Sequence, residues 1–259
     1  MASTAATPKY RAPLFTYERM FSAFGWLVLA LLVWFIVIPA VRFGRWEPMA
    51  LWTTWRFLLE GVQLTLLIGS VSVVLSSIFG FILALGRLSN VKLIRRLAGF
   101  YIEFVRALPS FLIIFYVFLG FSKLNLSAPT YAIIGLTLYT SAVMAEIFRA
   151  GILSVDRGQL EAAYALGLRP RDTVIRIILP QAIRRMMPAI VGQLVTLIKD
   201  TSLASVIAVA ELTSKGQILY GKYKNVLEMM FTVAMCYFAI CFTLSMLSKK
   251  LEVKDLSRA

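Results

Sequence analysis

Four charged residues interrupt stretches that are otherwise apolar: Glu103, Arg106, Lys199 and Asp200. A charge at the centre of a bilayer costs about 2.5–3.5 kcal/mol on insertion scales, so each needs a partner or a function. Glu103 and Arg106 lie three residues apart on one helix face, which predicts an ion pair between them. The pair fits a structural role and the polar lining of a transport path equally well.

Lys199 and Asp200 are adjacent, so on a helix they point in different directions and cannot easily pair. We expect them to face the bundle interior or a subunit interface, where Thr201 and Ser202 extend the polar patch. The pattern slightly favours a gate or a dimer interface over direct contact with a ligand.

Glu146 and Arg149 also lie three residues apart, near the end of another apolar stretch, and predict a structural or interfacial ion pair.

Several kinds of chemistry are excluded by what the sequence lacks. The chain has no histidine, which excludes His-ligated zinc and Ser-His-Asp catalysis. Cys236 and Cys241 are five residues apart and do not share a helix face, so neither a disulfide nor a metal pair is expected. No G-x-x-x-x-G-K-[ST] sequence occurs, so we expect no nucleotide site, no cofactor and no enzymatic activity in this chain.

The composition favours lipid as the solvent. Hydrophobic residues make up 59% of the 259 positions and charged residues 15%, whereas soluble domains are about 45–50% apolar. About 20 apolar residues span a bilayer core. Blocks of this kind predict an all-α transmembrane bundle of about six spans: Met20–Val41, Gly61–Gly86, Ala107–Ser122 (extended by Leu97–Ile102), Leu124–Ala145, Met186–Ala210 and Met229–Ser248.

The net charge of +14 is distributed as the positive-inside rule requires. If the N-terminus is cytoplasmic, the four inner segments carry 18 of the 27 Lys and Arg residues and the three outer segments carry 7. This asymmetry reports orientation and gives no support to a nucleic-acid partner. Both termini are therefore expected in the cytoplasm.

Four regions are predicted from this topology. Residues 1–20 read as a cytoplasmic tail, and residues 21–56 as a first transmembrane helix with an external loop. The first apolar block is too long for a signal-peptide core. Residues 57–250 form the main transmembrane domain, and 251–259 a cytoplasmic C-terminal tail.

A cytoplasmic segment of about 35 residues, Arg149–Arg185, connects the fourth and fifth blocks. Asp156 precedes a predicted helix, Leu160–Leu166, which ends at Gly167 in a C-cap position. Asp172 is then expected to cap a second helix that ends at Leu179, before Pro180. The segment thus predicts two short helices set at an angle on the membrane surface.

The residues of this segment resemble the EAA loop of ABC import permeases. The match consists of a glutamate, three small residues, two aliphatic residues and a proline at fixed spacing, over about 152–180: Glu161, Ala162, Ala163, Gly167, Ile177, Leu179 and Pro180. In that family the loop docks on a cytoplasmic ATPase. Small residues allow close backbone approach, and Glu161 offers a charge to a basic partner. An ordinary amphipathic surface helix is the alternative, and the long motif favours the coupling loop.

Other stretches are similar to the polar amino acid uptake family. Arg106-Ala107-Leu108-Pro109 resembles its Arg-Gly-Thr-Pro segment, from which Ala107 and Leu108 depart. The run Glu146–Ile152 and the sequence Lys199-Asp200-Thr201-Ser202-Leu203 also resemble that family. The resemblance covers about 57–250, which implies that the transmembrane helix in 21–56 is an extra one added to the family's domain.

The resemblance implies a permease subunit in the bacterial inner membrane. It implies ATPase subunits that bind the ATP, a second identical or different permease chain, an extracytoplasmic solute-binding protein and an amino acid substrate, within membrane lipid. A zwitterion would need polar groups in the path, and the candidates have the right chemistry but no diagnostic spacing: Glu103, Thr137, Ser141, Thr196 and Ser202.

Three other classes of protein fit these residues less well. An ion-coupled secondary amino acid transporter is suggested by Lys199 and Asp200, but no internal duplication is evident. A channel lacks a filter-like re-entrant segment, and a membrane enzyme lacks a catalytic cluster. The ATP-driven permease is the favoured prediction.

Overall fold

The computed structural model describes residues 46–256 together with Leu27, Leu31 and Trp34, and side chains as far as Met246. Most of the predicted first span, Met20–Val41, lies outside these residues. The chain divides into two units, Met1–Trp46 and Glu47–Ala259, and the second unit contains the helices described here.

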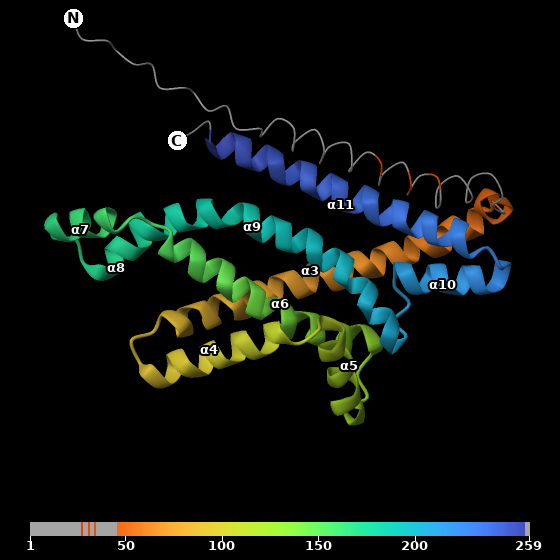
Figure 1. Ribbon diagram of the computed structural model, residues 1–259, viewed down its shortest axis with the longest axis horizontal. Helices are drawn as coiled ribbons and strands as arrows, with labels where there is room; N and C mark the ends of the chain where they lie inside the picture. Colours follow the sequence, from red (N-terminus) through yellow and green to blue (C-terminus); the bar gives the residue numbers. More distant parts are fainter. Residues whose placement is uncertain (1–26, 28–30, 32–33, 35–45, 257–259) are drawn as a thin grey trace, which may run out of the picture. The chain divides into compact units, whose positions relative to one another are not determined.

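Every regular element described in the second unit is helical (Figure 1). The longer helices are α3 (Trp52–Leu88), α4 (Lys92–Ala107), α5 (Ser110–Gly120), α6 (Ala128–Leu153), α7 (Arg157–Ala165), α9 (Leu179–Asp200), α10 (Leu212–Tyr223) and α11 (Val226–Leu256). Short pieces connect them: η2 (Glu47–Ala50), η3 (Ser122–Leu124), α8 (Pro170–Thr173), the π-helical η4 (Val174–Ile178) and η5 (Thr201–Ile207).

Five of the six predicted spans lie in the described part of the chain, and continuous helices confirm four of them. Four helical segments are long and apolar enough to cross a membrane: α3, α6, Pro170–Ile207 and Val226–Met246. Helices α4 and α5 make a fifth candidate, bent by 105° at a short break. Pro109 lies in that break, where proline lacks the backbone donor that a continuing helix needs.

Helix α3 is apolar on all sides, so small residues and not hydrophobic periodicity define its buried face. That face includes Gly61, Thr65, Gly69, Ser76 and Gly80. Small side chains let helix backbones approach closely where lipid offers no hydrophobic driving force.

Helix α6 occupies the centre of the bundle. Its most apolar 18-residue window is 61% buried, against 28% for α3 and 17% for the α11 segment. It contacts α3, α4, α5 and α9. Leu136 of α6 packs in the main core with Ile68, Ile114 and Leu197. Residues on different faces of α6 therefore reach different neighbours.

Helix α10 was not predicted, because its sequence is polar and lies between two spans. Its N-cap is Glu211, which is fully buried. The Glu211 carboxylate accepts hydrogen bonds from the amides of Thr213 (2.9 Å) and Ser214 (2.7 Å) and from the hydroxyl of Tyr237 (2.8 Å). Burial raises the pKa of Glu211 above its usual range, against these hydrogen bonds, which lower it.

Candidate functional site

The segment between α6 and α9 begins with α7, whose two ends are capped. At the start, the Asp156 carboxylate accepts a hydrogen bond from the amide of Gly158 at 2.8 Å. At the end, the amides of Gly167 and Leu168 donate to the carbonyls of Tyr164 and Ala163, the double bond of a Schellman motif. Gly167 has φ +72°, which only glycine adopts without strain. The predicted C-cap at Gly167 is confirmed, and Asp156, which was expected to precede the helix, is its N-cap.

The second predicted helix is different from what we expected. Helix α8 starts at Pro170, and the chain then runs without interruption through the π-turn η4 into α9. Asp172 does not cap this helix, since the N-cap position is Arg169, and it pairs with Arg176 at 3.6 Å. Pro180 does not end the helix either. It occupies the first turn of α9, directly after the π-turn, where its missing donor is tolerated.

The motif residues are arranged so that α7 presents a surface. Glu161 and Ala162 are exposed, whereas Ala163 is buried beneath the helix. Leu179 is half-buried and Pro180 exposed. Two apolar neighbours that sequence reasoning passed over, Tyr164 and Leu166, are 53% and 79% exposed. The exposure of a leucine at the end of a capped helix indicates a contact surface, and the spacing of the motif residues did not identify this leucine.

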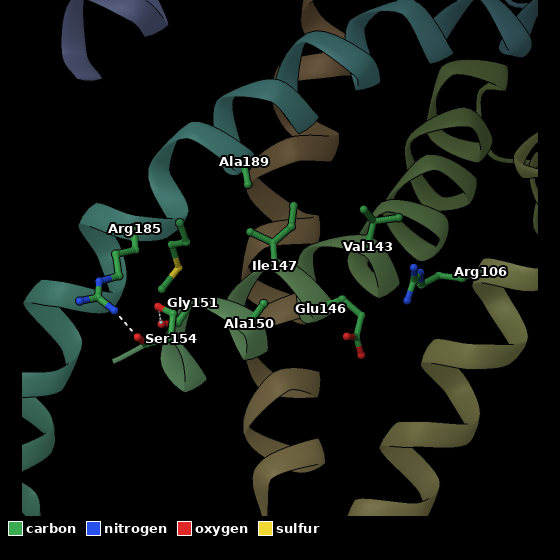
Figure 2. Close-up of a pocket in the computed structure, with 10 residues that line it drawn as sticks. Arg106, Val143, Glu146, Ile147, Ala150, Gly151, Ser154, Arg185 and Ala189 are labelled. Atoms are coloured by element: carbon green, nitrogen blue, oxygen red, sulfur yellow. Dashed lines mark hydrogen bonds between the residues drawn. The ribbon is translucent and has the colours of Figure 1, made fainter. Parts of the chain in front are cut away.

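The segment is anchored where α6 ends and α9 begins. A Cβ on Gly151 of α6 would lie 3.0 Å from the Cβ of Met186 on α9, so the two helices are in close contact there. Ala182 and Met186 are buried in a small cluster with Val155. The Arg185 guanidinium donates to the carbonyl of Ser154 (Figure 2).

A cavity of about 550 Å³ opens beside this anchor. Figure 2 shows that α4, α6 and α9 all contribute side chains to it. The lining is mixed, with apolar groups, a serine, a carboxylate and two guanidinium groups: Arg106, Val143, Glu146, Ile147, Ala150, Gly151, Ser154, Arg185, Met186 and Ala189. A space of this size with a few convergent polar groups is typical of small-molecule sites.

Of the two ion pairs predicted near the cavity, one is present and the other is replaced. The predicted Glu146–Arg149 pair is present at 2.8 Å. The predicted Glu103–Arg106 pair is not formed, because Glu103 binds Arg87 of α3 at 2.6 Å. Gly99 permits this, since a Cβ there would collide with the Arg87 guanidinium. Arg106 instead lines the cavity, with Glu146 on the facing helix (Figure 2).

Thr137 and Ser141 lie elsewhere, in a groove of about 450 Å³ among α3, α4 and α6. Ser141 shares a hydrogen bond of 3.1 Å with the hydroxyl of Tyr101. The rest of the lining is aliphatic or aromatic: Leu75, Phe79, Ile82, Leu83, Ile134 and Leu138.

The candidates of the fifth span are spread over several environments. Thr196 is exposed, and its hydroxyl donates to the Gly192 carbonyl at 3.0 Å. Thr201 is fully buried, and its hydroxyl donates to the carbonyl of Ile198 at 2.7 Å. Lys199 is exposed and Asp200 half-buried, in keeping with different directions, and Ser202 is half-buried in η5. The α-helix ends at Asp200, so the predicted polar patch lies at a change of helix type.

The chain is similar to known membrane transport proteins. Residues 76–254 match the family model described as binding-protein-dependent transport system inner membrane component. A probable glutamine ABC transporter permease protein of Bacillus subtilis is 39% identical over 204 residues, covering 77% of this chain and 94% of that protein. The glutamate transport system permease protein of Corynebacterium glutamicum is 35% identical over 215 residues, covering 81% and 79%.

Solved structures agree with these matches. A crystal structure of an amino acid ABC transporter with histidines has a chain that is 30% identical, with a TM-score of 0.76, over 81% of this chain and 98% of that one. The MetNI methionine ABC transporter in an inward-facing conformation is 21% identical with a TM-score of 0.64, over 80% and 98%, and shares the fold.

Proposed function

Since this chain belongs to the family of binding-protein-dependent transport system inner membrane components, we propose that it is the permease subunit of an ATP-driven importer of polar amino acids. The observation that carries the proposal is the family match over 76–254, together with relatives named as glutamine and glutamate permeases that align over most of their own length. The ion-coupled alternative is not favoured by these relatives. The chain is a multi-pass membrane protein, and we propose that both termini are cytoplasmic.

Helix α7 is the proposed contact with the ATPase. It is a short helix fixed at both ends, with Glu161, Ala162 and Leu166 exposed and Ala163 buried beneath. A docking surface requires an apolar centre with polar surroundings, and Leu166 with Tyr164 supplies the apolar part. Leu179 and Pro180 begin α9, to which α8 and η4 connect α7, and so belong to the proposed coupling segment. ATP is bound by the partner subunits in this proposal.

The cavity of Figure 2 is the proposed passage for the solute at the α7 end of the bundle. A zwitterionic amino acid carries a carboxylate and an ammonium group. Arg106 offers a guanidinium that binds carboxylates in bidentate geometry, and Glu146, which remains paired with Arg149, offers further acceptor capacity to the ammonium. Glu103 and Thr196 lie outside the residues lining this cavity, and their contact with solute stays a prediction. Lys199, Asp200, Thr201 and Ser202 stay predictions for a gate or an interface with a second permease chain.

The test is reconstitution of the full chain with the ATPase and solute-binding protein encoded beside it, and measurement of glutamine and glutamate uptake. The variants are Leu166→Asp on α7 and Leu124→Asp, a matched change at an exposed leucine of η3. We expect the natural chain and Leu124→Asp to co-purify with the ATPase and to import in the presence of ATP, and Leu166→Asp to lose both.

Equal co-purification of the two variants would refute α7 as the coupling contact. Uptake by the chain alone along an ion gradient would refute the importer. Replacing Arg106 with Gln tests the cavity separately. It should weaken uptake while co-purification of the ATPase is unchanged, and unaltered uptake would remove Arg106 from the path.

A further inference from the structure

The groove that holds Thr137 and Ser141 differs from the cavity in its chemistry. Its walls come from α3 (Leu75, Phe79, Ile82), α4 and α6, and almost every lining group is apolar. Phe79 and Ile82 remain 52% and 58% exposed. The groove therefore opens on the side of the bundle and offers a polar solute little to bind.

The polar groups of the groove are few and are largely engaged within the protein. The hydroxyl of Tyr101 lies 3.0 Å from the Leu138 carbonyl and 3.1 Å from the Ser141 hydroxyl. Thr137 is 6% exposed, and its hydroxyl has no hydrogen-bond partner among the described groups. Because the Thr137 hydroxyl oxygen is itself buried, the accessible lining is almost entirely apolar and suits a hydrocarbon.

A basic cluster lies close to one end of the groove, at the turn between α3 and α4. Its members are Arg87, Lys92, Arg95 and Arg96. Lys92, Arg95 and Arg96 are exposed, and Glu103, the one acidic residue between positions 87 and 106, is paired with Arg87. The turn therefore presents a net positive charge.

The distance between groove and cluster can be estimated from helix geometry. Arg87 lies four residues after Leu83, and Arg96 lies five residues before Tyr101. At 1.5 Å per residue, these separations are about 6 and 8 Å. Leu97, one turn before Tyr101, is 61% exposed and continues the apolar surface toward the basic end.

We propose that the groove and the basic cluster together form a site for one anionic phospholipid. An acyl chain lies along Leu75, Phe79 and Ile82, and the phosphate binds at Lys92, Arg95 and Arg96. The two features match the two parts of such a molecule, a hydrocarbon chain within the bilayer and a negative headgroup at its surface. The groove volume lies in the range of about 300–1,000 Å³ found for sites of small ligands. The proposal is independent of the transported solute.

The test is reconstitution of the full chain with its ATPase into nanodiscs of phosphatidylcholine containing one fifth phosphatidylglycerol, with mild detergent extraction and native mass spectrometry of retained lipid. One variant removes the headgroup contacts (Lys92→Gln, Arg95→Gln, Arg96→Gln). Another fills the groove (Leu138→Trp). The matched controls are Lys123→Gln, Lys222→Gln, Lys224→Gln for charge and Val74→Trp for bulk, because Val74 is exposed on α3 and does not line the groove.

The natural chain and both controls should retain one phosphatidylglycerol in preference to phosphatidylcholine. The triple variant should lose this preference by up to about a hundredfold, since each basic residue near an anionic surface contributes about fivefold. The Leu138→Trp variant should lose the bound lipid. Retention by either variant at the natural level would overturn the proposal. A second permease chain in the groove, seen as cross-linking between two copies of Phe79→Cys without retained lipid, would overturn it too.

Discussion

The close contact between α3 and α6 gives a prediction with a defined magnitude. A Cβ built on Gly80 would lie 2.6 Å from the Cβ of Met144 and 2.9 Å from the carbonyl oxygen of Ser141. Real Cβ atoms essentially never approach neighbours to within 3.0 Å, and neither of these neighbours is the end of a flexible side chain. Gly80→Ala therefore forces the two helices apart, and overpacking of this kind costs about 1–3 kcal/mol.

Gly192 in the interior of α9 provides the matched control. A Cβ there meets nothing within 4 Å, so Gly192→Ala changes helix propensity alone and should stabilise the chain by up to about 1 kcal/mol. The two glycine-to-alanine substitutions should therefore change the stability of the chain in opposite directions, although the chemical change is identical. For a chain of this length, a loss of 2 kcal/mol corresponds to about 4–8 °C in the unfolding midpoint.

The assay is thermal unfolding of the purified chain in detergent, monitored with a dye that reacts with thiols. Cys236 and Cys241 are free and partly buried, so their reaction reports opening of the bundle. We expect a lower midpoint for Gly80→Ala and an unchanged or higher one for Gly192→Ala. Equal midpoints would show that α3 and α6 do not pack as closely as the backbone indicates, and the explanation of the small-residue face of α3 would fail.

Three further predictions concern capped helices. Gly167→Ala should destabilise the C-terminal end of α7 by about 1–2 kcal/mol, because alanine is strained at φ +72°. The expected result is faster hydrogen exchange of the Leu168 amide, and unchanged exchange would contradict the prediction. Asp156→Ala should cost α7 about 1 kcal/mol by removing its N-cap, seen as faster exchange at Gly158, and Asp156→Asn should restore protection if capping is the cause. Burial raises the pKa of Glu211, so its contribution to stability should be greatest below about pH 4.5 and fall as the pH rises through the folded-state pKa. A Glu211→Gln variant should lose that part of the pH dependence of the unfolding midpoint. Identical pH profiles for the natural chain and the variant would refute the assignment.

The sequence was sufficient for features that depend on local chemistry. The uncharged blocks identified the four continuous spans in the described part of the chain and the bent pair α4–α5, because the bilayer sets the length of a span. Asp156 and Gly167 located the ends of α7, since an N-cap needs a short acceptor and a positive φ needs glycine.

The sequence failed where two elements distant in the chain decide the outcome. Arg106 was assigned to Glu103 because both share a face of α4, but Arg87 reaches Glu103 from α3 across the space left by Gly99. Pro180 read as a helix end, although a π-turn before it lets α8 continue into α9. Helix α10 was missed because its N-cap, Glu211, is fully buried and receives a hydrogen bond from Tyr237 of α11, a contact that no local pattern reveals.

Helix α6 connects the features on which the proposed function rests. Its C-terminal end packs on α9 through Gly151 and Met186, so α7 is attached to two helices that are in direct contact. Glu146, about one turn earlier, lines the cavity that the same two helices enclose with Arg106 of α4. Well-packed helices transmit displacement because their interiors are not compressible. A movement of α7 on the proposed ATPase therefore has to move α6 and α9, and with them the walls of the cavity.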